Sequence, residues 1–248
     1  MDYGKKVWYN MIIDAKDLSY QEINRALHKT NACTITGCMG QRFIAAGMRD
    51  KSIIIEGTPG NAMGAYLDGA KITVMGNAQD AVGDTMNDGS IIVHGSIGDA
   101  PGYAMRGGSI YIRDNAGYRA GIHMKEYRDK QPKMIIGGRA GSFLGEYQAG
   151  GVILVLGLHG DGKPIVGNFP STGMHGGKLY LRGDCSGISF PDQVHVRPAT
   201  EEEQAEIAGY VTTYCGYFGG DPKNVMAAPF ITVTPDSQNP YKQMYVTN

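Results

Sequence analysis

The chain has 248 residues, with 23 Lys and Arg against 24 Asp and Glu, so its formal net charge is −1. Charges of both signs are spread along the sequence, which excludes the basic footprint of a nucleic-acid-binding protein and a polybasic membrane-binding patch. The 37 glycines are about twice the usual share, but no strict G-X-Y period is present, which excludes collagen.

The cysteines and the N-terminus indicate the compartment. Cys33, Cys38, Cys185 and Cys215 form no C-x-x-C pair, which excludes a zinc ribbon and a bacterial-type iron–sulfur run. Residues 1–14 lack the apolar core of a signal peptide, and no apolar stretch approaches the roughly 20 residues of a membrane span. We therefore expect a cytoplasmic protein with free thiols and no membrane segment.

The first 36 residues predict an extended lead-in followed by a helix. A strand is expected at residues 7–13. Ser19 and Glu22 then form a capping box, and Ile23 and Leu27 follow at helical spacing. Because the end of a solenoid must be hidden, we expect this helix to cap a repeat array.

That array is a glycine repeat with a period of 19 residues, read most clearly in the units that begin at Gly57, Gly76 and Gly95. A second glycine lies seven residues into each unit. The unit before Gly57 is shorter than 19 residues. Two later units are longer, one by an insertion of five residues within residues 123–132 and one by seven residues within residues 158–177. Glycine suits the corners between short strands, so we predict corner positions at Gly57, Gly64, Gly76, Gly83, Gly95, Gly102, Gly121, Gly138, Gly145, Gly157 and Gly183.

Alignment of the strands by the glycine that follows each one produces two columns of large aliphatic side chains. The first column is Ile53, Ile72, Ile91, Ile110, Met134, Ile153 and Leu179. The second is Ile55, Val74, Val93, Ile112, Ile136, Val155 and Leu181. Strand alternation sends both columns to one face, and units this short bury that face only by stacking. The predicted fold is an all-β solenoid, a single-stranded right-handed parallel β-helix of about seven coils with flanking N- and C-terminal helices.

The middle position of each strand faces outward, and six of its seven residues are apolar or aromatic. The column is Ile54, Thr73, Ile92, Tyr111, Ile135, Leu154 and Tyr180. A solvated face would be polar, so this one is expected to be covered, either by the chain's own tail or by a partner. The sequence leaves both alternatives open.

The tail supplies a second helix and one more strand. Thr200 and Glu203 form another capping box, with apolar residues at helical spacing after it, and residues 229–235 have a strand pattern. Residues 239–248 are expected to form an arm. The predicted organisation is a lead-in and capping helix (1–36), a β-helix (37–190), and a C-terminal helix, strand and arm (191–248) that pack on the β-helix or on a partner.

Three stretches imitate catalytic or metal-binding motifs. Residues 157–164 approach a P-loop, but Pro164 stands where the Mg²⁺-binding hydroxyl is required. Cys185 lies in a sequence like a nucleophile elbow, but its flanking Gly183 is in register with the corners. His159, Asp161 and His175 share one insertion without a metal-ligand spacing. We predict no catalytic, cofactor-binding or metal-binding residue, and no activity of the chain alone.

Residues that contact a partner are predicted in two places. One is the outer column, at Ile54, Ile92, Tyr111, Ile135, Leu154 and Tyr180. The other is the charged insertion that begins at residue 123, where His123 and Lys125 are the candidates. A homo-oligomer is a further alternative.

The repeat register, residues 116–127 (AGYRAGIHMKEY) and residues 137–157 (GGRAGSFLGEYQAGGVILVLG) resemble the GXGXG domain family. That family includes the C-terminal β-helix domain of the glutamate synthase large subunit. The resemblance covers about residues 20–215 and includes the insertions as well as the repeats.

This resemblance implies a non-catalytic structural subunit of a glutamate synthase-like complex in nitrogen metabolism. Its partners would be an amidotransferase (glutaminase) subunit and an FMN-dependent synthase subunit. The chain has no Cys after Met1 to serve as glutaminase nucleophile and no cysteine cluster. The resemblance therefore implies that FMN and the iron–sulfur cluster belong to a partner and that this chain carries no cofactor.

Other interpretations remain open on the sequence. The family resemblance also extends to the C subunit of formylmethanofuran dehydrogenase and to N-methylglutamate synthase-type complexes. An autonomous glycan-acting β-helix enzyme would need a column of Asp or Glu, which the strands lack. A self-associating structural protein would pair its own outer faces.

Overall fold

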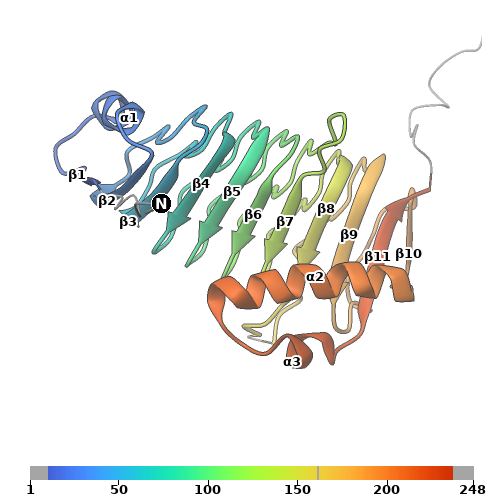
Figure 1. The fold of residues 1–248 in the computed structure, drawn as a ribbon. Helices are drawn as coiled ribbons and strands as arrows, with labels where there is room; N and C mark the ends of the chain where they lie inside the picture. Colours follow the sequence, from blue (N-terminus) through green and yellow to red (C-terminus); the bar gives the residue numbers. More distant parts are fainter. Residues whose placement is uncertain (1–10, 161, 237–248) are drawn as a thin grey trace, which may run out of the picture.

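The computed structural model describes residues 11–160 and 162–236, which form a parallel β-helix with its coils stacked along one axis (Figure 1). Its strands are β1 (Met11–Asp14), β2 (Ala32–Met39), β3 (Ser52–Thr58), β4 (Asp68–Val74), β5 (Asp88–Val93), β6 (Ser109–Ile112), β7 (Lys133–Ile136), β8 (Ala149–Val155), β9 (Gly176–Arg182), β10 (Val194–Pro198) and β11 (Phe230–Pro235). They form one sheet in the order β1-β2-β3-β4-β5-β6-β7-β8-β9-β11-β10. The predicted fold class is confirmed.

Strands β1 to β9 pair in parallel, each with the next strand along the chain. The register places Ile53 opposite Ile72, and Ile72 opposite Ile91, as the aligned columns predict. Both aliphatic columns are almost completely buried. They form the main core of the coil, because strand alternation turns them to the inside.

A narrower ladder of single bridges closes the opposite wall of the coil. It joins Ala78 to Ile97, Ile97 to Ala116, and Ala116 to Ala140. These small and branched side chains are buried against the core. The coil is therefore flattened between one long sheet and one short ladder, and its corners must reverse the chain within a few residues.

Each corner reverses the chain through three residues with left-handed backbone conformation. In the coil that begins at Gly76 these are Ala81 (φ 54°), Gly83 (φ 68°) and Thr85 (φ 52°). Ala81 and Thr85 donate their N–H groups to the next coil, whereas Gly83 donates to Met63 of the preceding coil. A Cβ at Gly83 would approach the Ile110 side chain to 2.8 Å, so the inner position favours glycine, although Ala45 and Ser171 occupy it in the first and last corners.

Side-chain oxygens add a second set of bonds between coils. Asp80 Oδ1 accepts from the backbone N–H of Asp99 at 2.9 Å, and Asp99 Oδ1 accepts from that of Tyr118 at 2.8 Å. Asn77 Oδ1 does the same for Ser96 at 2.8 Å. Because these oxygens occupy equivalent positions on successive coils, they fix the stacking register as well as satisfying N–H groups.

The helix α1 (Tyr20–His28) lies at the first coil and begins with the predicted capping box. Ser19 donates its N–H to Glu22 Oε2 at 2.8 Å, and Ser19 Oγ accepts from the Glu22 N–H. Ile23 is buried, and the Asn24 amide bonds to the backbone of the first corner. Of the strand expected at residues 7–13, residues 7–10 lie outside the described residues, and β1 begins at Met11.

The C-terminal part closes the other end of the sheet. β11 pairs antiparallel with β9, and β10, which the sequence pattern did not predict, pairs antiparallel with β11. Between them the chain forms α2 (Glu201–Phe218) and the short α3 (Pro222–Met226). The expected arm at residues 239–248 lies outside the described residues. Among the described residues, we find no helix with the length and apolar character needed to cross a membrane.

A buried carboxylate joins α2 to these two strands. The Glu203 carboxylate accepts hydrogen bonds from both terminal nitrogens of Arg197, at 2.7 and 2.8 Å. It also accepts hydrogen bonds from the Thr232 hydroxyl and from the Thr200 backbone N–H, each at 2.9 Å. The hydrogen bonds from Arg197, more than any other group, lower the pKa of Glu203 to about 2. The ionised carboxylate is thus part of the folded structure.

We expect Gly57→Ala to lower the free energy of unfolding by at least about 2 kcal/mol, because two costs combine there. Gly57 has φ 116°, and a Cβ would overlap the carbonyl oxygen of Cys38 on the preceding coil. Urea denaturation measures the change. Gly187→Ala is the matched control, since its φ is not left-handed and nothing lies within 4 Å of its Cβ position. Equal stability of the two variants would contradict the assignment of Gly57 as a required corner.

We also expect acid to weaken the α2 attachment through Glu203. A depressed carboxyl pKa contributes stability that is complete above the unfolded pKa, near 4.5, and is lost as pH falls toward the folded value of about 2. Glu203→Gln should therefore cost roughly 1–3 kcal/mol at pH 7 and flatten the fall in stability below pH 4.5. Thermal denaturation between pH 2 and 7 tests this, with the exposed neighbour Glu202→Gln as control.

Candidate functional site

The helix α2 lies across the outer face of strands β5 to β9 (Figure 1). It buries five of the six outer-column residues that were predicted to contact a partner: Ile92, Tyr111, Ile135, Leu154 and Tyr180. Ile207, Val211 and Tyr214 of α2 are buried in the same cluster as four of them. Of the two covers that the sequence left open, the chain's own tail occupies this part of the face.

Polar contacts anchor the helix as well. Tyr180 is completely buried and donates its hydroxyl to Glu206 Oε2 at 2.8 Å, and Lys178 Nζ reaches the same oxygen at 3.0 Å. Tyr210 donates to Glu206 Oε1 at 2.7 Å. Burial, together with the bond to Glu206, raises the pKa of Tyr180 well above its usual range. The cover is therefore both apolar and hydrogen-bonded, which fits a permanent attachment.

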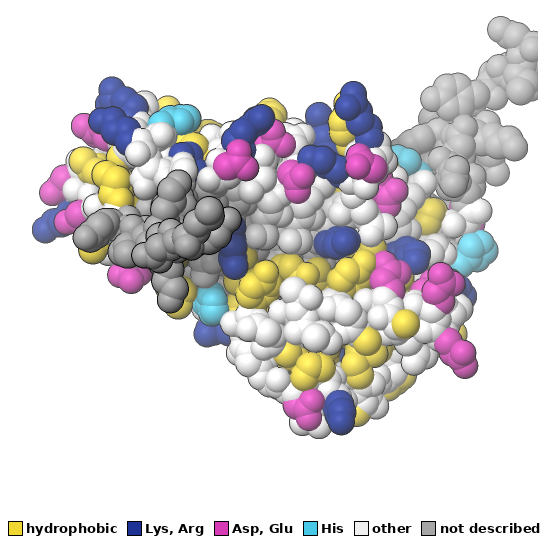
Figure 2. Space-filling view, in the orientation of Figure 1, with side chains coloured by type: hydrophobic (Ala, Val, Ile, Leu, Met, Phe, Trp, Pro, Cys, Tyr) yellow, Lys and Arg dark blue, Asp and Glu magenta, His cyan; other side chains and the backbone are white. Residues whose placement is uncertain are grey.

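The outer face of the first coils is not covered by α2. Ile54 is 36% exposed and Ile12 on β1 is 70% exposed, whereas the outward residues from Ile92 onward are buried. Thr73, the next outward position, is half-buried, and α2 ends nearby with Tyr217 against Lys71. Figure 2 shows hydrophobic side chains along the junction of α2 and the sheet, and mostly charged side chains along the opposite edge. One end of the outer face thus remains accessible.

The predicted corner glycines serve the turns in two ways. Eight of them have left-handed φ values: Gly57, Gly64, Gly83, Gly102, Gly121, Gly145, Gly157 and Gly183. Gly76, Gly95 and Gly138 do not, but a Cβ on any of these three would crowd the backbone of the preceding coil.

The motif-like stretches lack the structure that their chemistry would need. Residues 158–160 and 162–175 form no helix, although a P-loop requires one after its glycines. Burial raises the pKa of Cys185 to about 11, which leaves almost no thiolate to act as a nucleophile. His159 binds the carbonyl oxygen of Arg113 at 3.2 Å, and His175 lies in a different environment. Asp161 lies outside the described residues.

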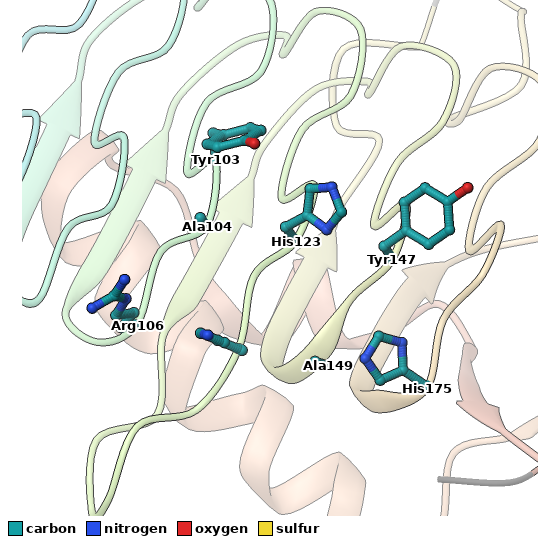
Figure 3. A pocket seen from close by; sticks show the side chains of 8 residues that line it. Tyr103, Ala104, Arg106, His123, Tyr147, Ala149 and His175 are labelled. Atoms are coloured by element: carbon teal, nitrogen blue, oxygen red, sulfur yellow. The ribbon is translucent and has the colours of Figure 1, made fainter. Parts of the chain in front are cut away.

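His123 and Lys125 line a hollow of about 370 Å³ on the charged edge, which we call the corner groove (Figure 3). Its other named side chains come from three further coils: Tyr103, Arg106, Tyr147 and His175. His123 stacks on Tyr147 at a ring distance of 5.2 Å and meets Tyr103 edge-on at 5.8 Å. Arg106 and Lys125 occupy equivalent positions on neighbouring coils. The groove is therefore basic along one side and aromatic along the other.

The sequence interpretation missed Tyr103, Arg106 and Tyr147, and it considered His175 only as a metal ligand. The repeat register held a signal for two of them. Repeat units begin at Asp114 and Gly138, and His123 and Tyr147 each lie nine residues after the start of their unit. Likewise, Arg106 and Lys125 share one offset. Since equivalent offsets stack on neighbouring coils, the columns outside the strands would have placed these side chains together.

The described residues define a parallel β-helix, a closed coil with one attached covering helix. A family model described as the GXGXG motif matches residues 8–236, and the chain belongs to that family. At the corners, left-handed residues recur at alternate positions, and the inner one is glycine in five corners, from Gly64 to Gly145.

One relative and one solved structure of similar fold show how the chain compares. It is 42% identical over 250 residues to the uncharacterized protein MJ1350 of Methanocaldococcus jannaschii, covering 95% of this chain and 96% of the relative. A chain in the crystal structure of the formyltransferase/hydrolase complex FhcABCD from Methylorubrum extorquens, solved with methylofuran, has a similar fold. There the TM-score is 0.63 at 20% identity, covering 82% of this chain and 73% of that one.

We expect Tyr180→Phe to loosen the cover without disturbing the coil. Loss of the hydroxyl removes a buried bond to Glu206 and leaves that carboxylate short of a donor, which costs roughly 1–3 kcal/mol. Hydrogen exchange of α2 amides should accelerate while that of β3 to β5 stays unchanged. Tyr66→Phe is the control, because Tyr66 is 59% exposed on a corner. Equal effects of the two substitutions would contradict an anchoring role for Tyr180.

Proposed function

We propose that this protein is a non-catalytic structural subunit of a glutamate synthase-like complex, where it holds a glutaminase subunit and an FMN-dependent synthase subunit in position. Membership of the GXGXG family supports this proposal, as does the resemblance of residues 116–157 to the glutamate synthase β-helix domain. The observation that carries it is the divided outer face, sealed by α2 over β5 to β9 and accessible at Ile54.

This division suits a scaffold for a physical reason. Stacked coils joined by backbone bonds in both directions are stiff, so a subunit bound at one end keeps its position relative to the other end. The accessible outward side chains Ile12 and Ile54, which lie on either side of Thr34 in the sheet, supply the apolar part of a contact, with polar side chains around them.

In this proposal the redox cofactors belong to a partner. An iron–sulfur cluster needs several thiolates at one place, and the four cysteines here are buried and free. Within the described residues, no group of three or more His, Cys, Asp or Glu could hold a metal. The donor set of this chain therefore does not fit the cluster, and the electron-transfer chemistry would take place elsewhere in the complex.

A second candidate is a component like the C subunit of a formylmethanofuran dehydrogenase-type complex. The observation that favours it is the fold likeness to a chain of FhcABCD, at a TM-score of 0.63. A third candidate, a self-associating structural protein, would use the same accessible side chains to pair two copies.

Affinity capture from the native organism distinguishes the three. With the tagged full chain as bait, we expect mass spectrometry to recover an amidotransferase and an FMN-dependent synthase. Recovery of formyltransferase or hydrolase subunits would favour the second candidate, and a pure homo-oligomer would favour the third. Recovery of neither enzyme subunit would overturn the first proposal.

A pair of variants on one coil tests the surface itself. Ile54→Asp should reduce the captured partners at least about fivefold, since a charge in the centre of an apolar contact costs more than 1 kcal/mol. Tyr66→Asp, at the corner of the same coil, should leave capture unchanged, and Asp tolerates the left-handed backbone there. Unchanged capture by both variants would exclude this face as the contact.

A further inference from the structure

We propose that the corner groove binds a small organic phosphate, namely a phosphate monoester that carries a planar ring. The groove of about 370 Å³ falls within the usual size range of small-molecule sites. This assignment does not depend on which complex the protein joins. It rests on three features of the lining: cations without counter-ions, an oriented histidine and a row of rings.

The two basic side chains of the groove, Arg106 and Lys125, form no ion pair within the described residues. Other cations on the protein surface are paired with acids, for example Arg49 with Asp68 and Lys130 with Asp88. Among the described residues, no carboxylate pairs with Arg106 or Lys125. The buried Nε of Arg106 also lacks an acceptor there. Two positive charges with free donors are therefore held together at one site.

The acids nearest in sequence are already engaged by other groups. Glu146, just before Tyr147, is buried and paired with Arg119 at 2.7 Å. Glu126, which follows Lys125, accepts the N–H of Gly151 at 3.1 Å. No carboxylate lines the groove. A ligand anion would thus meet positive charge without competition from a carboxylate of the lining.

His175 is oriented by the backbone. Its Nδ1 lies 3.1 Å from the carbonyl oxygen of Gly173, which can only accept, so Nδ1 carries a proton. A guanidinium fork, an ammonium group and an imidazole are the donors that proteins combine for phosphate oxygens.

The aromatic side of the groove indicates the rest of the ligand. Tyr103, His123 and Tyr147 come from three successive coils and form a continuous row of rings (Figure 3). Tyr103 is 41% exposed, so ring surface remains accessible. Rings stack on planar groups with a gain of about 0.5–1.5 kcal/mol, which favours an aromatic ester over inorganic phosphate.

Calorimetric titration of the full chain with phenyl phosphate, inorganic phosphate and benzoate tests the assignment. Phenyl phosphate should bind more tightly than either of the others, because only it uses both sides of the groove. The double variant Arg106→Gln, Lys125→Gln should weaken its binding about tenfold or more. Arg42→Gln with Lys16→Gln, two exposed cations near the first coil, should leave binding unchanged.

A second variant separates the rings from the charges. His123→Asn should reduce the preference for phenyl phosphate over inorganic phosphate while inorganic phosphate still binds, and Asn accepts the left-handed backbone of residue 123. If the double variant does not fold, the wild-type chain provides the readout, since the ring resonances of His123 and His175 should shift with phenyl phosphate.

Three results would overturn the proposal. They are no binding of any probe, binding that the groove variants leave unchanged, and equal affinity for phenyl phosphate and inorganic phosphate. If the double variant instead abolished capture of a protein partner and the wild-type chain bound no phosphate, the groove would be a protein contact.

Discussion

The left-handed corner is the constraint on which the rest of this structure depends. A coil that reverses direction within five residues leaves backbone N–H groups that must find acceptors. Because residues 81, 83 and 85 are left-handed, the N–H groups of Ala81 and Thr85 point to the next coil, and the N–H group of Gly83 points to the preceding one. The strands then stack in register, and the aliphatic columns become a continuous core. The backbone strain at each corner is offset by the hydrogen bonds between coils and by the packing of the core.

Stacking also turns a repeated position into a surface. Outward strand residues of successive coils form one apolar face, and α2 seals the part from β5 to β9 with Tyr180 and Glu206 as its polar anchor. Corner residues of successive coils form a second, charged surface, on which Arg106 and Lys125 lie side by side. A solenoid therefore offers long contact surfaces along its axis, and the proposed scaffold role rests on these surfaces.

The features predicted from sequence are those with a short-range or periodic cause. Ile53 and Ile72 align because a period of 19 residues and strand alternation determine both their neighbours and their face. The capping boxes at Ser19 and Thr200 are local, and both formed. The left-handed conformation of Ala81 was not predictable, because alanine carries no local preference for it and the bonds to neighbouring coils impose it. Strand β10 was missed because it is short and largely exposed, although Val194 and Val196 alternate with polar residues.

The sequence by itself determined the coil, its core and the positions of its corners, because each repeat contains its own strand, its own glycines and the same inward side chains. Only the tertiary structure decided what lies on the outside. The apolar outer column is covered by the chain's own tail because α2 packs on it. This helix is more than 50 residues away from Tyr111 along the chain. Likewise, insertions of five and seven residues separate the groove side chains in sequence, and stacking alone brings Tyr103 and His175 to one site. Contacts between distant segments carry no periodic signal, so they are set by packing.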